Sequence, residues 1–236
     1  MQLFYNNAIK TSDKQFTFNK EESKHIVKVL RKKNGDKIYI TNGLGYLFKS
    51  VIISDSIKQC TVLIEETEQQ PTGRNYQLHL AIAPTKNNDR LEWFIEKATE
   101  IGIDEITPIL CTNSERNKIN IERLNKKIIA ALKQSLQYHK PVLHPPQKFS
   151  EFITQMRNSK NFIAHCRNGK KKLLPKNLSE DSRFLILIGP EGDFSEKEVQ
   201  EAIKNSFIPV SLGNTRLRTE TAALFAVQWF AVFNLD

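Results

Sequence analysis

Three short segments of the sequence carry residue types that a ligand site needs. They read HCRNGKKK from His165, GPEGDFSEKE from Gly189 and GNTRLRTET from Gly213. Four of the nine glycines of the chain fall in them, and a glycine lets the backbone turn sharply or approach a ligand closely. The end of a strand would explain any one of these glycines, but three such segments in succession favour a shared binding site.

The apolar runs before these segments predict the elements that position them. NFIAHC, FLILIG and IPVSLG have the composition of buried strands, and open parallel sheets bind their ligands beyond the carboxyl ends of the strands. We therefore expect the three segments to meet at one edge of a parallel sheet. Neither the dinucleotide fingerprint G-x-G-x-x-G nor the phosphate loop G-x-x-x-x-G-K-[ST] occurs, so NAD and ATP are poor candidates for the ligand.

Two helices are predicted next to the second and third segments. Ser195 and Glu198 have the spacing of a capping box, so Ser195 is expected to start a helix and not to act as a nucleophile. From Thr221 to Phe233 the chain is apolar around almost the whole helical circumference, which predicts a helix buried on all sides, inside the fold or against a second subunit. Glu220 then acts either as a favourable first-turn charge or as a hydrogen-bond acceptor for a ligand.

Strand and helix patterns alternate through most of the remaining chain. YQLHLAIA and EITPIL predict strands, and NNDRLEWFIEKATEIG predicts a helix that begins at an Asn or Asp and ends at Gly102. This alternation favours an α/β fold, a parallel sheet with helices on both faces. A further helix is indicated by one apolar face, which consists of Ile121, Leu124, Ile128, Leu132 and Leu136.

The first part of the chain has a different pattern. KIYITNGLGYLFKSVIISD places two β-rich runs around Asn42-Gly43, a dipeptide that tolerates the positive φ angles of a tight hairpin, and CTVLIEE adds a strand. EESKHIVKVLRKKNGD predicts one short basic helix that stops near Gly35. The polar stretch TEQQPTGRN reads as a linker. We therefore predict two domains, residues 1–72 and 73–236.

Composition limits the class of protein. With 39% hydrophobic and 26% charged residues among 236, the chain is typical of a soluble globular protein and not of a disordered one. The net charge of +9 favours a polyanionic partner such as nucleic acid, although it also fits an ordinary soluble surface. Three cysteines at no framework spacing indicate a reducing, cytoplasmic location. No signal peptide or membrane span is expected.

The second and third segments also carry a resemblance. LILIGPEGDFSEKEV followed by SLGNTRLRTETAAL resembles the paired signature of the RsmE family, SPOUT-class methyltransferases that use S-adenosylmethionine to methylate N3 of a uridine in 16S ribosomal RNA of the small ribosomal subunit. HIVKVLRKKNGDKIYITNGLGYLF resembles the family's N-terminal PUA-like β-barrel domain, and FIEKATEIGIDEITPI and ALKQS match its catalytic domain. QSLQYHKPVLHPP departs from a Gly-Arg-rich stretch of the family, which leaves the role of residues 134–146 open.

The resemblance implies features that the residue patterns cannot supply. It implies a C-terminal SPOUT trefoil knot and a homodimer, whereas fold rules alone would give an ordinary open sheet. It also implies that the knot loops hold the cofactor S-adenosylmethionine without a metal. The five histidines show no metal-ligand spacing either. The implied cofactor residues are Ala164, His165, Ile188, Gly189, Pro190, Glu191, Gly192, Ser211, Leu212, Gly213, Leu217, Arg218, Thr221 and Ala222.

The implied reaction assigns roles to three charged residues. Methyl transfer is an in-line displacement, in which positioning of the two reactants supplies much of the rate. Uridine N3 must also lose its proton. Glu220 or Glu191 could accept it as a general base, or Arg218 could stabilise the developing uracil anion. The sequence does not decide between these routes, and we expect Arg218 to be the most important side chain.

The implied substrate is a base in structured RNA, which must be unpaired or flipped out before N3 can react. Basic side chains are expected to hold its phosphates, although a merely solvated face would look the same. A non-catalytic RNA-binding or ribosome-assembly protein, or a methyltransferase for another RNA position, are the alternatives. The residues expected to contact RNA are Lys24, Lys28, Arg31, Lys32, Lys33, Arg167, Lys170, Lys171 and Lys172.

Overall fold

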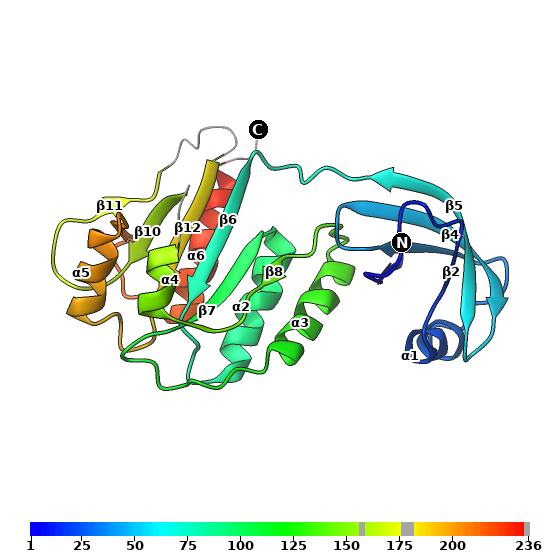
Figure 1. The fold of residues 1–236 in the computed structure, drawn as a ribbon, viewed down its shortest axis with the longest axis horizontal. Helices are drawn as coiled ribbons and strands as arrows, with labels where there is room; N and C mark the ends of the chain where they lie inside the picture. The colour runs from blue at the N-terminus through cyan, green and yellow to red at the C-terminus, as the bar shows by residue number, and fades with distance from the viewer. Residues whose placement is uncertain (156–158, 176–181, 234–236) are drawn as a thin grey trace. The chain divides into compact units, whose positions relative to one another are not determined.

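The computed structural model of the chain, drawn in Figure 1, describes residues 1–155, 159–175 and 182–233. It divides into two compact units. The first consists of residues 1–73 and 132–140, and the second of residues 74–131 and 141–236. Within the described part of the chain, every helix is too short or too polar to span a lipid bilayer.

The first unit is built on a five-stranded sheet with the strand order β1-β3-β4-β5-β2. β3 and β4 are antiparallel, with Thr41 opposite Leu47, so the predicted hairpin is confirmed. Gly43 and Gly45 take φ angles of 77° and 85° in its loop, which only glycine adopts without strain. The strands are β1 (Leu3–Tyr5), β2 (Gln15–Thr17), β3 (Lys37–Thr41), β4 (Tyr46–Asp55) and β5 (Cys60–Gln69).

The basic helix of the first unit is shorter than the sequence predicts. Helix α1 (Lys20–Lys24) continues into a π-helical turn, η1 (His25–Val29), and the chain then leaves the helix with Arg31 at a φ of 56°. The predicted end near Gly35 is therefore wrong. Ile26 of η1 is fully buried in the apolar core of the sheet, so this turn anchors the helical segment.

Residues 132–140 pair with the hairpin of the first unit although they are distant from it in sequence. The carbonyl oxygen of Tyr138 accepts a hydrogen bond from the Gly45 amide at 3.0 Å, and the Lys140 amide donates to the Gly43 carbonyl at 2.9 Å. His139 Nε2 lies 2.8 Å from the Gln70 carbonyl oxygen. Part of the segment whose role the sequence leaves open therefore completes the edge of the hairpin.

The second unit contains an eight-stranded sheet in which every pair of neighbouring strands is parallel, so the predicted α/β fold is confirmed. The strand order is β11-β13-β10-β12-β6-β7-β8, and β9 also pairs with β7. The strands are β6 (Tyr76–Ile82), β7 (Glu105–Leu110), β8 (Val142–Leu143), β9 (Gln147–Lys148), β10 (Lys160–Ala164), β11 (Lys172–Leu173), β12 (Ser182–Ile188) and β13 (Ile208–Ser211).

The helix ends of the second unit follow local capping chemistry. The Asn87 side chain accepts from the Asp89 amide at 2.9 Å at the start of α2, and Gly102 ends this helix with a φ of 104°, as predicted. The predicted capping box of Ser195 and Glu198 is present at the start of α5. The helices are α2 (Asn88–Ile101), α3 (Ile121–Gln134), α4 (Phe149–Gln155), α5 (Glu196–Lys204) and α6 (Thr219–Val232).

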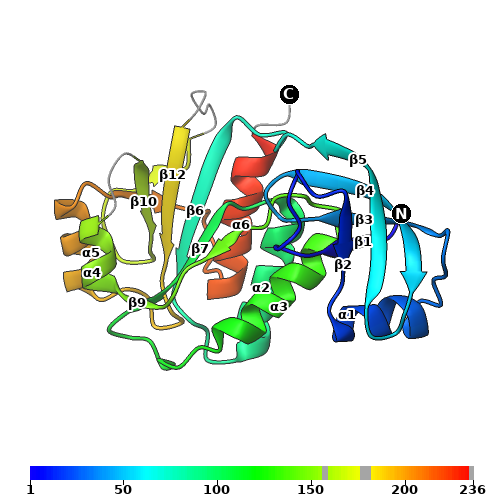
Figure 2. The same cartoon turned by 45° about the vertical axis from the view of Figure 1, so that its right-hand side comes forward.

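Helices cover both faces of the parallel sheet, as Figures 1 and 2 show. Alternate residues of β6 point to opposite faces. Leu78 and Leu80 belong to the core that contains residues of α2 and α6, whereas Ala81 belongs to the core that contains residues of α4 and α5. Burial on both faces explains why the strands read as continuous apolar runs.

Helix α6 is buried on only one face within the chain. Ala223, Val227 and Phe230 are fully buried against the sheet, but Val232 is 52% exposed. The half-buried Trp229 lies against Phe225 and Phe233, with ring centroids 5.7 and 4.6 Å apart. Among the described residues, the sheet therefore covers one side of the helix, and burial of the other side against a second subunit stays a prediction.

Candidate functional site

Three neighbouring strands bring the loops singled out in the sequence to one edge of the sheet. β10 lies between β13 and β12, and Ala164 at its end pairs with both Ile188 of β12 and Val210 of β13. The loops that follow these strands therefore leave the sheet at the same level.

The three loops and the start of α6 line one cavity of about 840 Å³. This volume lies within the range of small-molecule and cofactor sites. The lining consists of residues 164–167 and 171 from the first loop, 188–193 from the second, and 210–219 and 222 from the third loop and α6.

Hydrogen bonds join the first loop to the second. The Cys166 amide donates to Asp193 Oδ2 at 2.9 Å, and Arg167 Nε donates to the Phe194 carbonyl oxygen at 3.0 Å. Lys171 Nζ donates to the Arg167 carbonyl oxygen at 2.8 Å, which closes the first loop on itself. The two loops thus form one connected wall of the cavity.

His165 presents polar atoms that the chain leaves available to a ligand. Both ring nitrogens are buried, and neither has a hydrogen-bond partner among the residues that the structure describes. Burial, and then the nearby charge of Lys171, lower the pKa of His165, so the ring is neutral at pH 7. A buried polar atom without a partner costs about 1–3 kcal/mol, and a ligand that bonds to this ring would remove that cost.

The glycines of the second loop are needed for close packing. A Cβ atom on Gly189 would lie 3.0 Å from the Phe194 ring, and one on Gly192 would lie 3.1 Å from Asn113 Cβ. Asn113 Nδ2 also donates to the carbonyl oxygens of Gly192 and Asp193, at 3.2 and 2.9 Å. These contacts fix the position of the second loop beside the cavity.

The start of α6 makes the cavity electropositive. Thr219 Oγ1 donates to the Gly189 carbonyl oxygen at 3.0 Å, which fixes the first turn of the helix beside the second loop. The free amide groups of that turn carry a partial positive charge. Arg218, the N-cap residue, and Arg216 both line the cavity and are exposed. An electron-rich ligand group is favoured at this end.

The structure gathers most of the predicted cofactor residues around this cavity. Every member of the predicted set lines it except Thr221, which is exposed on α6. Of the three residues predicted to act on the proton, Arg218 and Glu191 line the cavity and Glu220 does not.

The two carboxylates make different contacts. Glu220 is buried in the first turn of α6, and its Oε1 lies 3.7 Å from Arg90 Nε. Glu191 is half-buried at the cavity, and its Oε1 accepts a hydrogen bond from the Lys86 amide at 2.9 Å. The buried Oε2 of Glu220 has no hydrogen-bond partner among the described residues, so both of its predicted roles, a favourable charge at the helix start and an acceptor for a ligand, stay predictions.

The basic residues predicted to contact RNA fall into two groups. Near the cavity, Arg167 and Lys171 line it, while Lys170 and Lys172 lie on the same loop and on β11 without lining it. In the first unit, Lys32 is half-buried. The exposed members of the first unit, on α1, on η1 and in the turn after them, are Lys24, Lys28, Arg31 and Lys33.

Several supporting residues were missed in the sequence. Lys86 and Asn113 follow the ends of β6 and β7, and their contacts with Glu191 and Gly192 hold the second loop. Arg116 Nη2 in turn donates to the Lys86 carbonyl oxygen at 2.9 Å. The sequence did contain a signal for these residues, because both loops also follow carboxyl ends of parallel strands. The loops were not selected as candidates because neither carries a glycine.

The structure also corrects the expectation that the histidines form no constellation. His79 and His144 lie beside Glu105, and the potential ligand atoms of the three side chains are within 4.8 Å of one another. None of them lines the cavity of the three loops. Spacing along the chain could not reveal this cluster, because the sheet brings together residues from three separate segments.

Comparisons with known proteins agree with these observations. A family model described as an RNA methyltransferase domain matches residues 72–231, and one described as an RNA methyltransferase PUA domain matches residues 18–65. Among curated proteins, the "Ribosomal RNA small subunit methyltransferase E" of Buchnera aphidicola subsp. Acyrthosiphon pisum (strain APS) is 33% identical. That match covers 90% of this chain and 86% of the relative.

Solved structures are similar over nearly the whole chain. A "probable rRNA-methyltransferase" from Porphyromonas gingivalis is 38% identical, with a TM-score of 0.92 over 99% of this chain and 98% of its own. A protein of Legionella pneumophila, solved "in complex with the bound cofactor SAM", is 26% identical. Its TM-score is 0.85, and the match covers 98% of this chain and 96% of its own.

Proposed function

The chain belongs to the RNA methyltransferase family that these matches define, and on that premise we propose that it transfers a methyl group from S-adenosylmethionine to N3 of a uridine in 16S ribosomal RNA. The observation that carries the proposal is the single cavity formed by three strand-end loops and the start of α6. The N3 position and the 16S substrate rest on the resemblance of the two C-terminal motifs.

The residues around the cavity fit S-adenosylmethionine. Leu212 and Leu217 offer apolar surface for the adenine, while the backbone next to Gly189 and Gly192 can approach the ligand closely. The unpartnered ring nitrogens of His165 offer hydrogen bonds. When bound there, the cofactor supplies an electrophilic methyl group. We retain the trefoil knot of these loops as a prediction.

The protein's own residues then orient the uracil and handle its proton. Arg218 lines the cavity at the electropositive start of α6, where its charge would stabilise a uracil anion as N3 loses its proton. Glu191 is the carboxylate of the predicted pair that lines the cavity, so we assign proton acceptance to it. Exclusion of water by the loop walls would strengthen both effects.

We assign recognition of the RNA backbone to basic residues of both units. The residues around Lys28 and Arg31 lie on the domain that matches the PUA model, and Arg167 borders the cavity. Their charges suit phosphates and carry no information about base sequence. Since ribosomal RNA is the substrate, we expect the protein in the cytoplasm.

The function is tested by incubating the protein with labelled S-adenosylmethionine and small ribosomal subunits that lack the modification. We expect one labelled nucleotide, a uridine methylated at N3, when the RNA is digested and mapped. Label at another position would contradict the assigned substrate. Binding of RNA without any label would instead indicate a non-catalytic RNA-binding protein of the same fold. A parallel reaction with naked 16S RNA identifies the form of the substrate.

Replacing Glu220 and Glu191 in turn tests which of the two carboxylates accepts the proton. We expect Glu220→Gln to retain methyl transfer within about threefold, because this side chain faces Arg90 and does not line the cavity. The free energy of unfolding should fall by about 1 kcal/mol, since a first-turn charge stabilises a helix by about this amount. The matched variant, Glu191→Gln, should lower the turnover rate at least about tenfold. A larger loss in Glu220→Gln than in Glu191→Gln would reverse the assignment.

We also propose that the protein is a homodimer, as the resemblance implies. The half-buried aromatic face of α6 supports this, because an apolar helix face is stable when a second surface covers it.

Sedimentation equilibrium measures the oligomeric state directly. We expect twice the chain mass of 27.2 kDa for the wild type and the monomer mass for Phe225→Asp, which places a charge on the aromatic face of α6. Ile203→Asp on α5 makes the same change at an exposed apolar residue elsewhere, and it should remain dimeric. A monomeric wild type at micromolar concentration would refute the dimer.

A further inference from the structure

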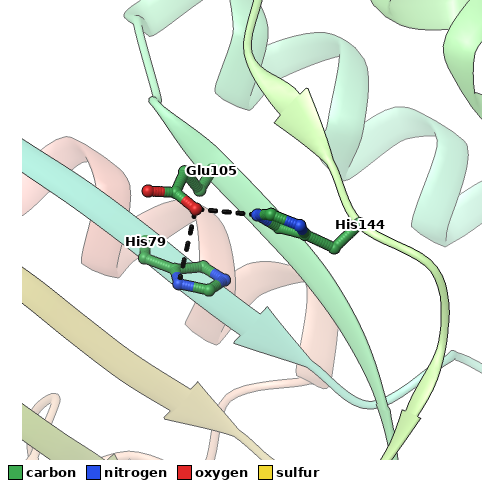
Figure 3. A group of neighbouring side chains, drawn as sticks. All are labelled: His79, Glu105 and His144. Atoms are coloured by element: carbon green, nitrogen blue, oxygen red, sulfur yellow. Dashed lines mark hydrogen bonds and ion pairs between the residues drawn. The ribbon is translucent and has the colours of Figure 1, made fainter. Parts of the chain in front are cut away.

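Two histidines and a glutamate meet on the sheet, as Figure 3 shows. None of them lines the loop cavity. His79 on β6 is the register partner of Glu105 on β7. His144 follows β8, and its amide donates to the Ile106 carbonyl oxygen of β7 at 2.9 Å. Backbone pairing thus fixes three potential ligands side by side. The cluster faces α4, because the Phe152 ring lies 5.5 Å from the His79 ring.

The hydrogen bonds of His79 leave one ring nitrogen for a cation. Its Nε2 lies 2.7 Å from Oγ1 of the buried Thr107, and its Nδ1 lies 3.9 Å from Glu105 Oε2. In the tautomer that donates Nε2–H to Thr107 Oγ1, the lone pair is on Nδ1, the nitrogen that faces the carboxylate. A hydrogen bond from the other ring nitrogen commonly orients a metal-binding histidine.

His144 is the third potential ligand. Its Nε2 lies 2.7 Å from Glu105 Oε2, the oxygen that also faces His79. Both histidines therefore face the same Glu105 oxygen, and the three potential ligand atoms lie within 4.8 Å of one another. Two ligand atoms of one tetrahedral zinc ion stand about 3.3 Å apart when each bond is about 2.0 Å. The contact between Glu105 and His144 must widen slightly, which these side chains allow because they are 38% and 32% exposed.

The surroundings of the cluster also point to a ligand. The three side chains line a cavity of about 330 Å³. Gln147 lines it too, and its buried Oε1 has no hydrogen-bond partner among the described residues. Arg183 borders the same cavity, but it is exposed, so water screens its charge. An ion can enter from solvent, and a metal-bound water could reach the unpartnered oxygen.

We propose that His79, Glu105 and His144 bind one divalent transition-metal ion, with zinc as the best-fitting member of the class. Imidazole suits zinc, copper, iron and nickel, whereas magnesium and calcium prefer sites made of oxygen alone. The ion would join β6, β7 and the segment after β8. Since the cluster and the loop cavity share no lining residue, this site stabilises the sheet and takes no part in methyl transfer.

Calorimetric titration of zinc into the full-length, chelator-treated protein tests the proposal. We expect one zinc ion per chain, a higher unfolding temperature with zinc, and visible absorption bands of a site with nitrogen and oxygen ligands when cobalt(II) replaces zinc. His144→Ala and Glu105→Gln should each weaken zinc binding at least about 100-fold. Both replace half-exposed side chains, so the fold should survive.

His25→Ala provides the matched control, because it removes a histidine that lies outside the cluster. It should bind zinc like the wild type. Methyl transfer should be unchanged within about twofold in His144→Ala, which separates this proposal from the proposed function. Zinc binding that is equally strong in His144→Ala and the wild type, or no binding at micromolar zinc, would overturn the proposal.

Discussion

Replacing Arg218 with alanine is expected to lower the turnover rate of methyl transfer at least about 100-fold while the protein remains folded. Loss of one preorganised group that stabilises a developing charge commonly costs this much. Arg218 is placed to stabilise a developing charge, because it is the N-cap of α6 and lines the cavity beside the free amides of the first turn. No side-chain hydrogen bond from Arg218 caps the helix, so its removal should not unravel α6.

Arg216 provides the matched control for this prediction. It lines the same cavity, is exposed, and lies two residues before Arg218 on the same loop. If this exposed arginine contacts an RNA phosphate, we expect Arg216→Ala to raise the KM for RNA and to leave the turnover rate within about threefold, because such a contact supplies binding and not chemistry. Single-turnover rates with saturating RNA separate the two effects.

The affinity for the cofactor completes the test. Calorimetry should give S-adenosylmethionine binding to Arg218→Ala within about tenfold of the wild type, because backbone and apolar groups of three loops hold the cofactor in our proposal. Near-normal turnover in Arg218→Ala would remove this residue from the reaction. Equal turnover losses in both variants would show that the two arginines act together on the RNA.

The sequence predicts the site loops well because their signals are local. Each loop follows an apolar strand, and the parallel register that aligns Ala164 with Ile188 and Val210 follows from the α/β fold. Gly189 and Gly192 lie where the backbone packs closely against a neighbouring side chain, so the residue type at these two positions already indicates the packing. Knowledge of the strand ends was therefore enough to place the loops together.

Contacts between residues that are distant in sequence cannot be recognised from single residue types. Much of the pairing of residues 132–140 with the hairpin loop depends on backbone groups of Tyr138 and Lys140, which most residue types could provide. His79, Glu105 and His144 come from three separate segments, and only the register of the folded sheet joins them. The apolar residues around the whole circumference of α6 indicate that the helix is buried. They do not indicate whether the sheet or a second subunit covers each side.

Replacing Phe230 with alanine is expected to lower the free energy of unfolding of the second unit by about 3–5 kcal/mol, the usual cost of a large cavity left by a buried phenylalanine. Phe230 is fully buried, and its ring lies 4.9 Å from the ring of Phe184 and 6.2 Å from that of Tyr76. Both tryptophans of the chain, Trp93 and Trp229, belong to the second unit, so their fluorescence during urea denaturation reports its unfolding.

Val232→Ala removes apolar atoms from the same helix at a residue that is 52% exposed, and it should cost less than about 1 kcal/mol. The difference between these two variants bears on the cofactor site. The core around Phe230 holds α6 in the position in which Thr219 donates to the Gly189 carbonyl oxygen. Weaker cofactor binding in Phe230→Ala than in Val232→Ala would follow from this. Equal unfolding midpoints in the two variants would mean that the sheet core does not anchor α6, and the loops would then have to position the first turn of the helix by themselves.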